Sequence, residues 1–377
     1  GLNLVLSGAV EKQGNRYQIS MKVTNAIDGA VVGDVRTRAN TSEGVIPAAT
    51  RLVGDVREAM GDRTTATDPI FAQRSLSASS PDVLRYYAAA QNASADNKWE
   101  DARDQLLKAI AVDPNFGLGY VLLSTASRNL GNVQAANDYV EKAMAHLDSM
   151  TNRERLATRG LYFRLNGDYE KCLSEQRDLI KAYAADVVGH NQLAVCAGLL
   201  RDFKTARDEM AAIVELLPKR TIFRNNLALQ SIYLSDFAEG EKQANEVLKQ
   251  VPAGEAFALL ELGASLLGQE RPKEAIDAYT RAATVPGNGP TFSASGLADV
   301  AVYEGRYGDA IRLAEQGAAA DLAAKTPVPD RAAGKLLHQA YAHLLRGEKA
   351  AAVASAQKAL GLSKILKVRF LAARIDI

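Results

Sequence analysis

The spacing of hydrophobic residues along the chain changes at about residue 60. Before that point, three segments are rich in apolar and β-branched side chains at partial two-residue spacing, namely residues 2–10, 17–25 and 30–39. The dipeptides Gly14-Asn15 and Asp28-Gly29 separate these segments, and such dipeptides tolerate the positive φ angles of tight hairpins. The pattern therefore predicts a three-stranded antiparallel sheet.

A helical pattern follows the third predicted strand. In residues 45–60 the apolar side chains recur three and four positions apart, which gives a helix one face to lay on the sheet. Thr41 or Ser42 can cap this helix, and we expect Pro47 to delay its first regular turn. Residues 1–60 are thus predicted to form a small α+β segment. Its first strand is an open edge, which we expect residues upstream of the chain to complete.

Residues 61–80 are small and polar and include Pro69, so we predict that they form a linker. Pro81 suits the first turn of a new helix, with Ser80 as its cap. From there on the chain repeats itself. Each unit places one small residue early in its second half, at Ala102, Ala136, Cys172, Ala206, Gly240, Ala275, Ala310 and Ala352. The intervals between these positions are 34, 36, 34, 34, 35, 35 and 42 residues.

This period resembles the tetratricopeptide repeat, a helix-turn-helix unit of 34 residues. The small residue lets two antiparallel helices approach closely. Five units also carry an aromatic residue three positions earlier, which would fill the corner at the turn. These residues are Trp99, Tyr169, Phe203, Phe237 and Tyr307. One hairpin cannot bury its apolar face, so the units are expected to stack.

We therefore predict a mostly α fold. A right-handed α-solenoid of about eight tetratricopeptide hairpins would span residues 81–362, preceded by the three-strand, one-helix segment. Residues 363–377 mix basic and apolar side chains and are predicted to form a C-terminal capping helix.

The charge balance excludes some classes of partner. The chain has 45 basic and 44 acidic side chains, a net charge of +1, and no lysine or arginine block. A dedicated nucleic-acid binder needs a basic stripe, so we expect no nucleic-acid partner. No stretch approaches the roughly 20 apolar residues of a membrane-spanning helix, so we expect no direct membrane insertion of this chain.

The sequence contains no constellation of residues that is typical of an enzyme. The four histidines include no pair four residues apart, and no Walker-type loop or nucleophile elbow is present. We expect no catalytic residue, no metal and no cofactor, and any catalytic domain would lie upstream. Cys172 and Cys196 lack the spacing of a zinc site and are too few for a disulfide framework. Both are predicted to be buried free thiols.

The resemblance to tetratricopeptide repeats implies a binding site. In that family the first helix of each repeat lines an inner groove, and polar residues on its inward face meet a protein or peptide ligand. On this chain the implied peptide-binding groove residues are Tyr87, Gln91, Arg128, Arg164, Asn191, Asn225, Tyr233, Tyr303 and Tyr341, with Thr125 and Asp299 on the same face. Arginine, asparagine and tyrosine can hydrogen-bond a peptide backbone. The alternative for any one of them is a solvated side chain without a ligand.

The N-terminal segment resembles the closing half of a TolB-like α/β domain. The resemblance rests on residues 6–10, 14–19 and 25–29. In bacterial signalling proteins this domain often precedes tetratricopeptide repeats, downstream of a eukaryotic-like serine/threonine kinase, a cyclase or a DNA-binding domain. The resemblance implies a scaffold or sensory region of such a protein. A free-standing adaptor for envelope or secretion assembly is the alternative. An extracytoplasmic and a cytoplasmic location, and the oligomeric state, are left open.

Overall fold

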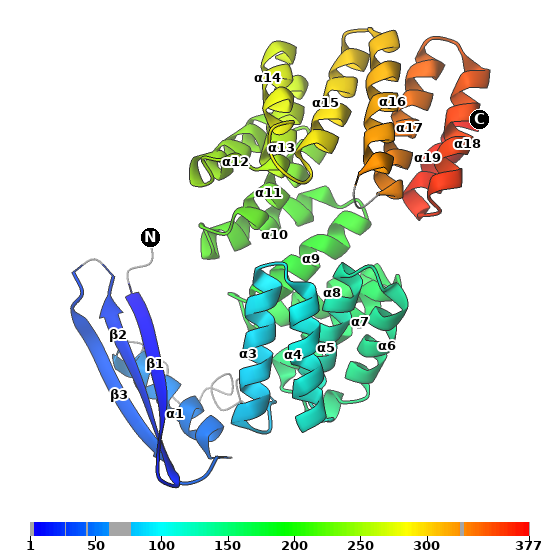
Figure 1. The fold of residues 1–377 in the computed structure, drawn as a ribbon. Coiled ribbons are helices and arrows are strands. Elements are labelled where there is room, and N and C mark those ends of the chain that lie inside the picture. Colours follow the sequence, from blue (N-terminus) through cyan, green and yellow to red (C-terminus); the bar gives the residue numbers. More distant parts are fainter. Residues whose placement is uncertain (1–3, 27, 43, 60–76, 325–327, 377) are drawn as a thin grey trace. The chain divides into compact units, whose positions relative to one another are not determined.

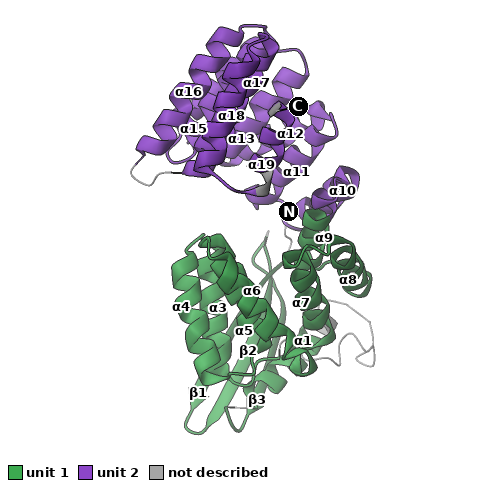
Figure 2. Cartoon of the chain, turned by 90° about the vertical axis from the view of Figure 1, so that its right-hand side faces the viewer, with its two compact units in different colours: residues 1–196 green, residues 197–377 purple. Residues whose placement is uncertain are grey.

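The computed structural model describes residues 4–26, 28–42, 44–59, 77–324 and 328–376 (Figure 1). The chain folds into two compact units, residues 1–196 and 197–377 (Figure 2). The first unit holds the sheet and the first helices of the array, and the second unit is entirely helical in the residues that are described. Most of the predicted linker at 61–80 lies outside the described residues.

The N-terminal segment is a meander of three antiparallel strands with one helix. The strands are β1 (Leu4–Gln13), β2 (Arg16–Asn25) and β3 (Val31–Ala39), in the order β1-β2-β3, and the helix is α1 (Val45–Ala59). Gly14, with φ of 64°, makes the first hairpin turn possible. Ala48 and Leu52 of α1 pack on Ile19 and Ala39 of β2 and β3. The helix thus covers β2 and β3, while β1 stays largely exposed.

The rest of the first unit consists of helices in sequence. They are α3 (Pro81–Ala95), α4 (Trp99–Val112), α5 (Gly117–Asn129), α6 (Val133–Met144), α7 (Asn152–Leu165), α8 (Tyr169–Ala182) and α9 (Val187–Leu199), with a short 3-10 turn at Leu147–Ser149. The pairs α3/α4, α5/α6 and α7/α8 are helical hairpins, and each packs on the next. The division between the units falls within α9.

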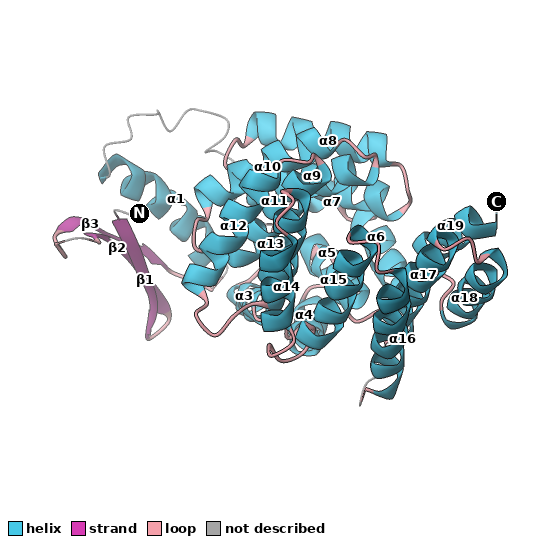
Figure 3. Cartoon of the chain, turned by 90° about the horizontal axis from the view of Figure 1, so that it is seen from above, coloured by secondary structure: helices cyan, strands magenta, loops and turns pink. Residues whose placement is uncertain are grey.

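The second unit continues the same arrangement. Its helices are α10 (Phe203–Leu216), α11 (Thr221–Tyr233), α12 (Phe237–Gln250), α13 (Ala256–Gly268), α14 (Pro272–Ala282), α15 (Gly289–Tyr303), α16 (Tyr307–Ala323), α17 (Pro329–Leu345), α18 (Lys349–Leu362) and α19 (Leu366–Asp376). Helices α11 to α18 form four hairpins in which consecutive helices pack side by side, as Figure 3 also shows. The predicted mostly helical fold with a small antiparallel sheet is confirmed.

The hairpins share one turn geometry. Between the first and second helix of every repeat, one residue has a positive φ of 59–82°. These residues are Asn97, Gly131, Gly167, Arg201, Ser235, Glu270, Gly305 and Gly347. In four repeats the next residue caps the second helix through its side chain, namely Asn132, Asp168, Asp202 and Asp236. The left-handed residue therefore reverses the chain, and the cap starts the next helix.

The small residues of the repeat lie where the helices pack most closely. The seven that carry a Cβ atom are exposed by no more than 1%. At the eighth position, Gly240, an added Cβ would lie 2.5 Å from Ser265 Oγ on the next first helix. Larger side chains would force the hairpins apart, which explains why small residues recur at this place.

The prediction of two free thiols is wrong. Cys172 of α8 and Cys196 of α9 are joined by a disulfide, and both residues are fully buried. Cys172 occupies the small-residue position of its second helix, and this position faces the first helix of the following repeat. The packing of α8 and α9 thus brings together two residues that are 24 apart in sequence.

The longest interval of the repeat, 42 residues between Ala310 and Ala352, goes with two longer helices. Helices α16 and α17 have 17 residues each, which is longer than the other helices of the repeats. Lys335 of α17 is buried there, and its Nζ donates to Asp321 of α16 and to Thr291 of α15. Burial lowers the pKa of the Lys335 ammonium, and the hydrogen bond and charge of Asp321 partly offset this effect. Val368 and Ala372 of α19 complete the core beside α17 and α18.

Candidate functional site

The predicted groove residues of the first unit differ in how much surface they offer. Tyr87 of α3 packs edge-on against Phe116, with ring centroids 5.4 Å apart, and burial raises the pKa of its hydroxyl. Asn191 of α9 is half-buried, whereas Gln91 of α3 is exposed. Tyr87 therefore serves the core, and Gln91 is exposed but hydrogen-bonds Tyr87.

Two guanidinium groups lie near each other in this unit. Arg128 lies in the last turn of α5 and Arg164 in the last turn of α7, at the same place in successive first helices. Burial, together with the positive charge of Arg128, lowers the pKa of Arg164 to about 10. Neither side chain forms an ion pair with a described residue, and Arg164 Nε has no hydrogen-bond partner in the described part of the chain. The two guanidinium groups can donate hydrogen bonds to an anionic or carbonyl group of a ligand.

The second unit holds the other four predicted residues. Asn225 of α11 is 4% exposed, and its Nδ2 donates to Glu255 Oε2, the cap of α13, at 3.0 Å. It therefore holds two first helices together and is not accessible to a ligand. Tyr233, Tyr303 and Tyr341 are exposed by 54%, 51% and 52%, on α11, α15 and α17. These large exposed rings offer contact area on three first helices.

A pocket of about 490 Å³ opens beside Tyr303. We call it the Asp299 pocket. It is lined by Phe237 of α12, by Ala264, Leu267 and Gly268 of α13, by Glu270 in the following turn, by Tyr279 of α14, and by Asp299 and Tyr303 of α15. Among these residues, the sequence singled out Asp299 and Tyr303.

Two small residues, Gly268 and Ala264, line the pocket. At the last place of the first helix, where α11 and α15 carry Tyr233 and Tyr303, α13 carries Gly268. The Phe237 ring packs on that glycine so closely that an added Cβ would lie 2.5 Å from it. Ala264, one turn earlier, leaves the remaining space open. Sequence reasoning missed the pocket because Phe237 and Tyr279 come from second helices.

Asp299 has an unusual position in this pocket. Its side chain keeps 52% of its surface accessible, yet the surrounding protein raises the pKa of its carboxyl by desolvation, which His338 partly offsets. The ion pair with His338 of α17 spans 3.8 Å. Tyr279 is 1% exposed, and its hydroxyl makes no hydrogen bond to another described residue, so it remains free to bond with a guest in the pocket.

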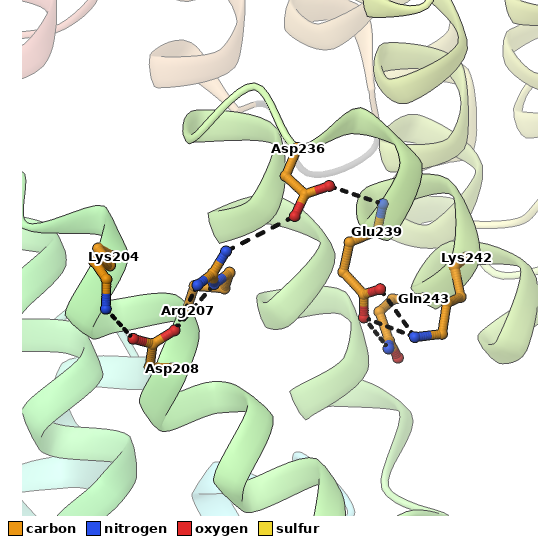
Figure 4. Close-up of polar contacts among 7 residues, drawn as sticks. All are labelled: Lys204, Arg207, Asp208, Asp236, Glu239, Lys242 and Gln243. Atoms are coloured by element: carbon orange, nitrogen blue, oxygen red, sulfur yellow. Dashed lines mark hydrogen bonds and ion pairs between the residues drawn. The ribbon is translucent and has the colours of Figure 1, made fainter.

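By contrast, charged residues on α10 and α12 pair with one another. Asp208 accepts from Lys204 at 2.8 Å and from Arg207 at 2.7 Å (Figure 4). Arg207 also lies 3.8 Å from Asp236, which caps α12 by accepting from the Glu239 amide at 3.3 Å. These side chains neutralise each other and link one second helix to the next.

Two further observations bear on the chemistry of the chain. No three His, Cys, Asp or Glu side chains of the described residues are arranged to hold a metal ion. Within the same residues, every helix is too short or too polar to cross a membrane.

Comparisons with known proteins agree with the repeat assignment. Residues 225–290 match the family model for the tetratricopeptide repeat. A search of curated protein sequences finds none that matches. Among solved structures, the chain is similar to one described as the anaphase-promoting complex hetero-tetramer Cut9-Hcn1. The TM-score is 0.50 and the identity 14%, over 76% of this chain and 54% of that one. The chain therefore spans about half the length of that protein.

A bacterial structure shows a similar arrangement. A tetratricopeptide repeat protein from Parabacteroides merdae is 15% identical, with a TM-score of 0.42 over 78% of this chain and 98% of that one. At these identities the likeness concerns the fold alone. The helical hairpins are thus arranged like those of a tetratricopeptide repeat solenoid, and residues 225–290 match the model of that repeat.

Proposed function

We propose that the chain is a non-catalytic scaffold that binds a protein or peptide on the first helices of its repeats. The observation that carries the proposal is the repetition of available side chains at equivalent places. Arg128 and Arg164 take one place in successive first helices, and Tyr233 and Tyr303 take another. Unpaired guanidinium groups and exposed aromatic rings are the groups that dominate binding at protein interfaces.

The proposed contacts differ between the two units. In the first unit, Arg128 and Arg164 would bind carbonyl or carboxylate oxygens of the partner. In the second unit, Tyr233, Tyr303 and Tyr341 would supply flat apolar area with a polar end. Asn225 is omitted from these contacts because it is buried.

The test uses a library of random nonapeptides displayed on phage and selected against the full chain. We expect enrichment of a limited set of peptides, and at least tenfold weaker binding of that set by Arg128→Ala/Arg164→Ala or by Tyr233→Ala/Tyr303→Ala. Arg103→Ala is the matched control, since Arg103 lies half-buried on second helix α4, where it pairs with Asp104. If the selected peptides bind all these variants as they bind the native chain, the site assignment is wrong.

We further propose that the array belongs to a larger bacterial signalling protein. The support is the TolB-like resemblance of the N-terminal segment. An adaptor in envelope or secretion assembly is the second candidate. The buried disulfide between Cys172 and Cys196 favours the extracytoplasmic location in either case, because disulfides persist in oxidising compartments. The gene sequence ahead of Gly1 separates the two: a kinase core with a membrane span supports the first, and a signal peptide alone supports the second.

A further inference from the structure

We propose that the Asp299 pocket holds a cationic side chain, lysine or arginine, of the bound peptide. The inference rests on the proposed function, because it assigns one subsite to the peptide-binding face. It specifies which residue the partner must carry and where that residue lies.

The charge of the pocket is the first argument. Glu270 and Asp299 both line it, and none of its eight lining residues is basic. Arg271, the neighbour of Glu270, does not neutralise the pocket, because its guanidinium is held by Glu241 and Glu274 at 2.7 Å each. Among the described residues, His338 is the one basic group paired with Asp299, at 3.8 Å. Two carboxylates in a recess attract a cation and disfavour an anion.

The walls of the pocket supply the second argument. Phe237, Tyr279 and Tyr303 line the space. The Phe237 ring packs on Gly268 and the Tyr279 ring on Gly263 and Gly296, whereas Tyr303 is 51% exposed. Aromatic faces attract ammonium and guanidinium groups, and they also pack against the methylene stem of lysine or arginine. An aromatic wall with carboxylates at its rim is therefore complementary to a long cationic side chain along its whole length.

The hydroxyl of Tyr279 is the third argument. The residue is 1% exposed and lines the pocket, and its oxygen makes no hydrogen bond to a described residue. Burial and the nearby Asp299 raise the pKa of Tyr279, so its hydroxyl stays protonated and can both accept and donate. A guest that carries N–H donors satisfies its acceptor side.

Size is consistent with such a guest. Gly268 and Ala264 leave a recess of about 490 Å³, which is within the range of ligand sites in proteins. An uncharged leucine or phenylalanine would fill the same recess, but it would offer no hydrogen-bond or charge partner to Glu270, Asp299 or the Tyr279 hydroxyl. The cationic side chain is therefore favoured over the apolar one.

The experiment starts from the peptides that the phage selection yields. Each peptide is synthesised with a fluorescein label as selected. It is also synthesised as a set of variants, in each of which a single arginine is replaced by citrulline or a single lysine by norleucine. Fluorescence anisotropy with the full chain then gives the dissociation constants. We expect one of the neutral replacements in each peptide to weaken binding about tenfold. This difference should become smaller at higher salt concentration.

Four variants and one control locate the effect. Asp299→Asn and Glu270→Gln remove one pocket charge each, and in the double variant the neutral and basic peptides should bind within about twofold of each other. Ala264→Leu fills the recess without changing charge and should have the same consequence. Asp277→Asn is the control, because it removes an equal charge from an exposed site on α14. It should leave the tenfold preference intact.

The outcomes separate the two proposals. Peptides that bind the native chain but show no preference for a basic residue overturn the pocket assignment and leave the scaffold function standing. The same holds for a preference that survives both Ala264→Leu and the double variant. If the chain retains no peptide from the library, both proposals fall. Thermal unfolding of each variant confirms that a lost preference does not come from a lost fold.

Discussion

Asp299 Oδ1 lies 3.8 Å from His338 Nδ1, and the two side chains come from the first helices α15 and α17 of successive repeats. Both are about half exposed, at 52% and 45%, so the pair contributes little to stability. Its consequence concerns the Asp299 pocket. Any cation that enters the pocket shares the carboxylate of Asp299 with His338.

The charge at residue 338 is therefore expected to tune the binding of basic peptides. His338→Lys places a permanent positive charge beside Asp299 and should weaken the binding of basic peptides about tenfold. His338→Gln removes the imidazole without adding charge and serves as the control. Fluorescence anisotropy with the selected peptides measures both. Equal dissociation constants for the two variants would contradict the placement of the cation next to Asp299.

The buried carboxyl group of Glu261 is expected to make the free energy of unfolding depend on pH. Glu261 of α13 is 4% exposed, and its Oε2 atom has no hydrogen-bond partner among the described residues. Burial raises the pKa of this carboxyl well above 4.5, and the charge of Glu255 raises it further. Between pH 4.5 and that raised pKa, the native state binds more protons than the unfolded state. The free energy of unfolding should therefore fall as pH rises through this window.

Glu261→Gln removes the titrating group. We expect the variant to be more stable than the native chain at pH 8 and to show a flatter pH dependence above pH 5. Urea unfolding at pH 5, 6, 7 and 8 measures this. Glu246→Gln is the control, since Glu246 is half-buried on α12 and pairs with Lys249. A native chain that gains stability steadily from pH 5 to pH 8, with Glu261→Gln unchanged from it, would oppose the assignment.

The disulfide predicts a response to reductant. It closes a loop with a sequence separation of 24 residues, for which the chain-entropy model gives a stabilisation of about 3 kcal/mol. In the unfolded chain, a thiol reagent should label neither cysteine unless a reductant is added. The double variant Cys172→Ala/Cys196→Ala should unfold at a lower urea concentration, and reductant should leave its midpoint unchanged. Labelling of two thiols in unreduced, unfolded protein would show that the cysteines are not paired.

Much of the architecture is predictable from the sequence, because it follows from local packing rules. The recurring small residues, such as Ala102 and Ala136, mark close helix contacts at a fixed interval, and the structure places them in the core. The cysteine pairing was not predictable in this way. Its two partners belong to different repeats, and their approach depends on the rotational phase of α8 against α9.

The candidate site was predictable only in part. The expectation that polar residues of the first helices line the groove finds the exposed Tyr233, Tyr303 and Tyr341. It also selects Asn225 of α11, which is buried and hydrogen-bonds Glu255. Polarity at an inward place does not distinguish an accessible side chain from one that binds its neighbour. The pocket depends on the absence of a side chain at Gly268, and a search for chemically active residues overlooks such an absence.

Asp236 both caps α12 and pairs with Arg207 of α10, and two substitutions distinguish these contributions to stability. Asp236 accepts from the Glu239 amide and lies 3.8 Å from Arg207 (Figure 4). Asp236→Ala removes both contacts and should cost about 1–2 kcal/mol of stability. Asp236→Asn keeps an acceptor for the cap and removes only the exposed ion pair, so its cost should be below about 1 kcal/mol. Urea unfolding of the two variants compares them, and equal losses would mean that the ion pair matters more than the cap.

Glu270 connects the stability of a turn to the proposed binding of a cation. It adopts φ of 60°, a conformation that four other hairpin turns fill with glycine, and a side chain there costs about 1 kcal/mol. Glu270→Gly should therefore raise the free energy of unfolding by up to about 1 kcal/mol and at the same time weaken the binding of basic peptides. Glu270→Gln keeps the backbone cost and loses only the charge, so it should weaken binding with stability unchanged. Urea unfolding and peptide anisotropy on both variants separate the two effects. A more stable Glu270→Gly variant that binds basic peptides as the native chain does would mean that this carboxylate takes no part in the pocket.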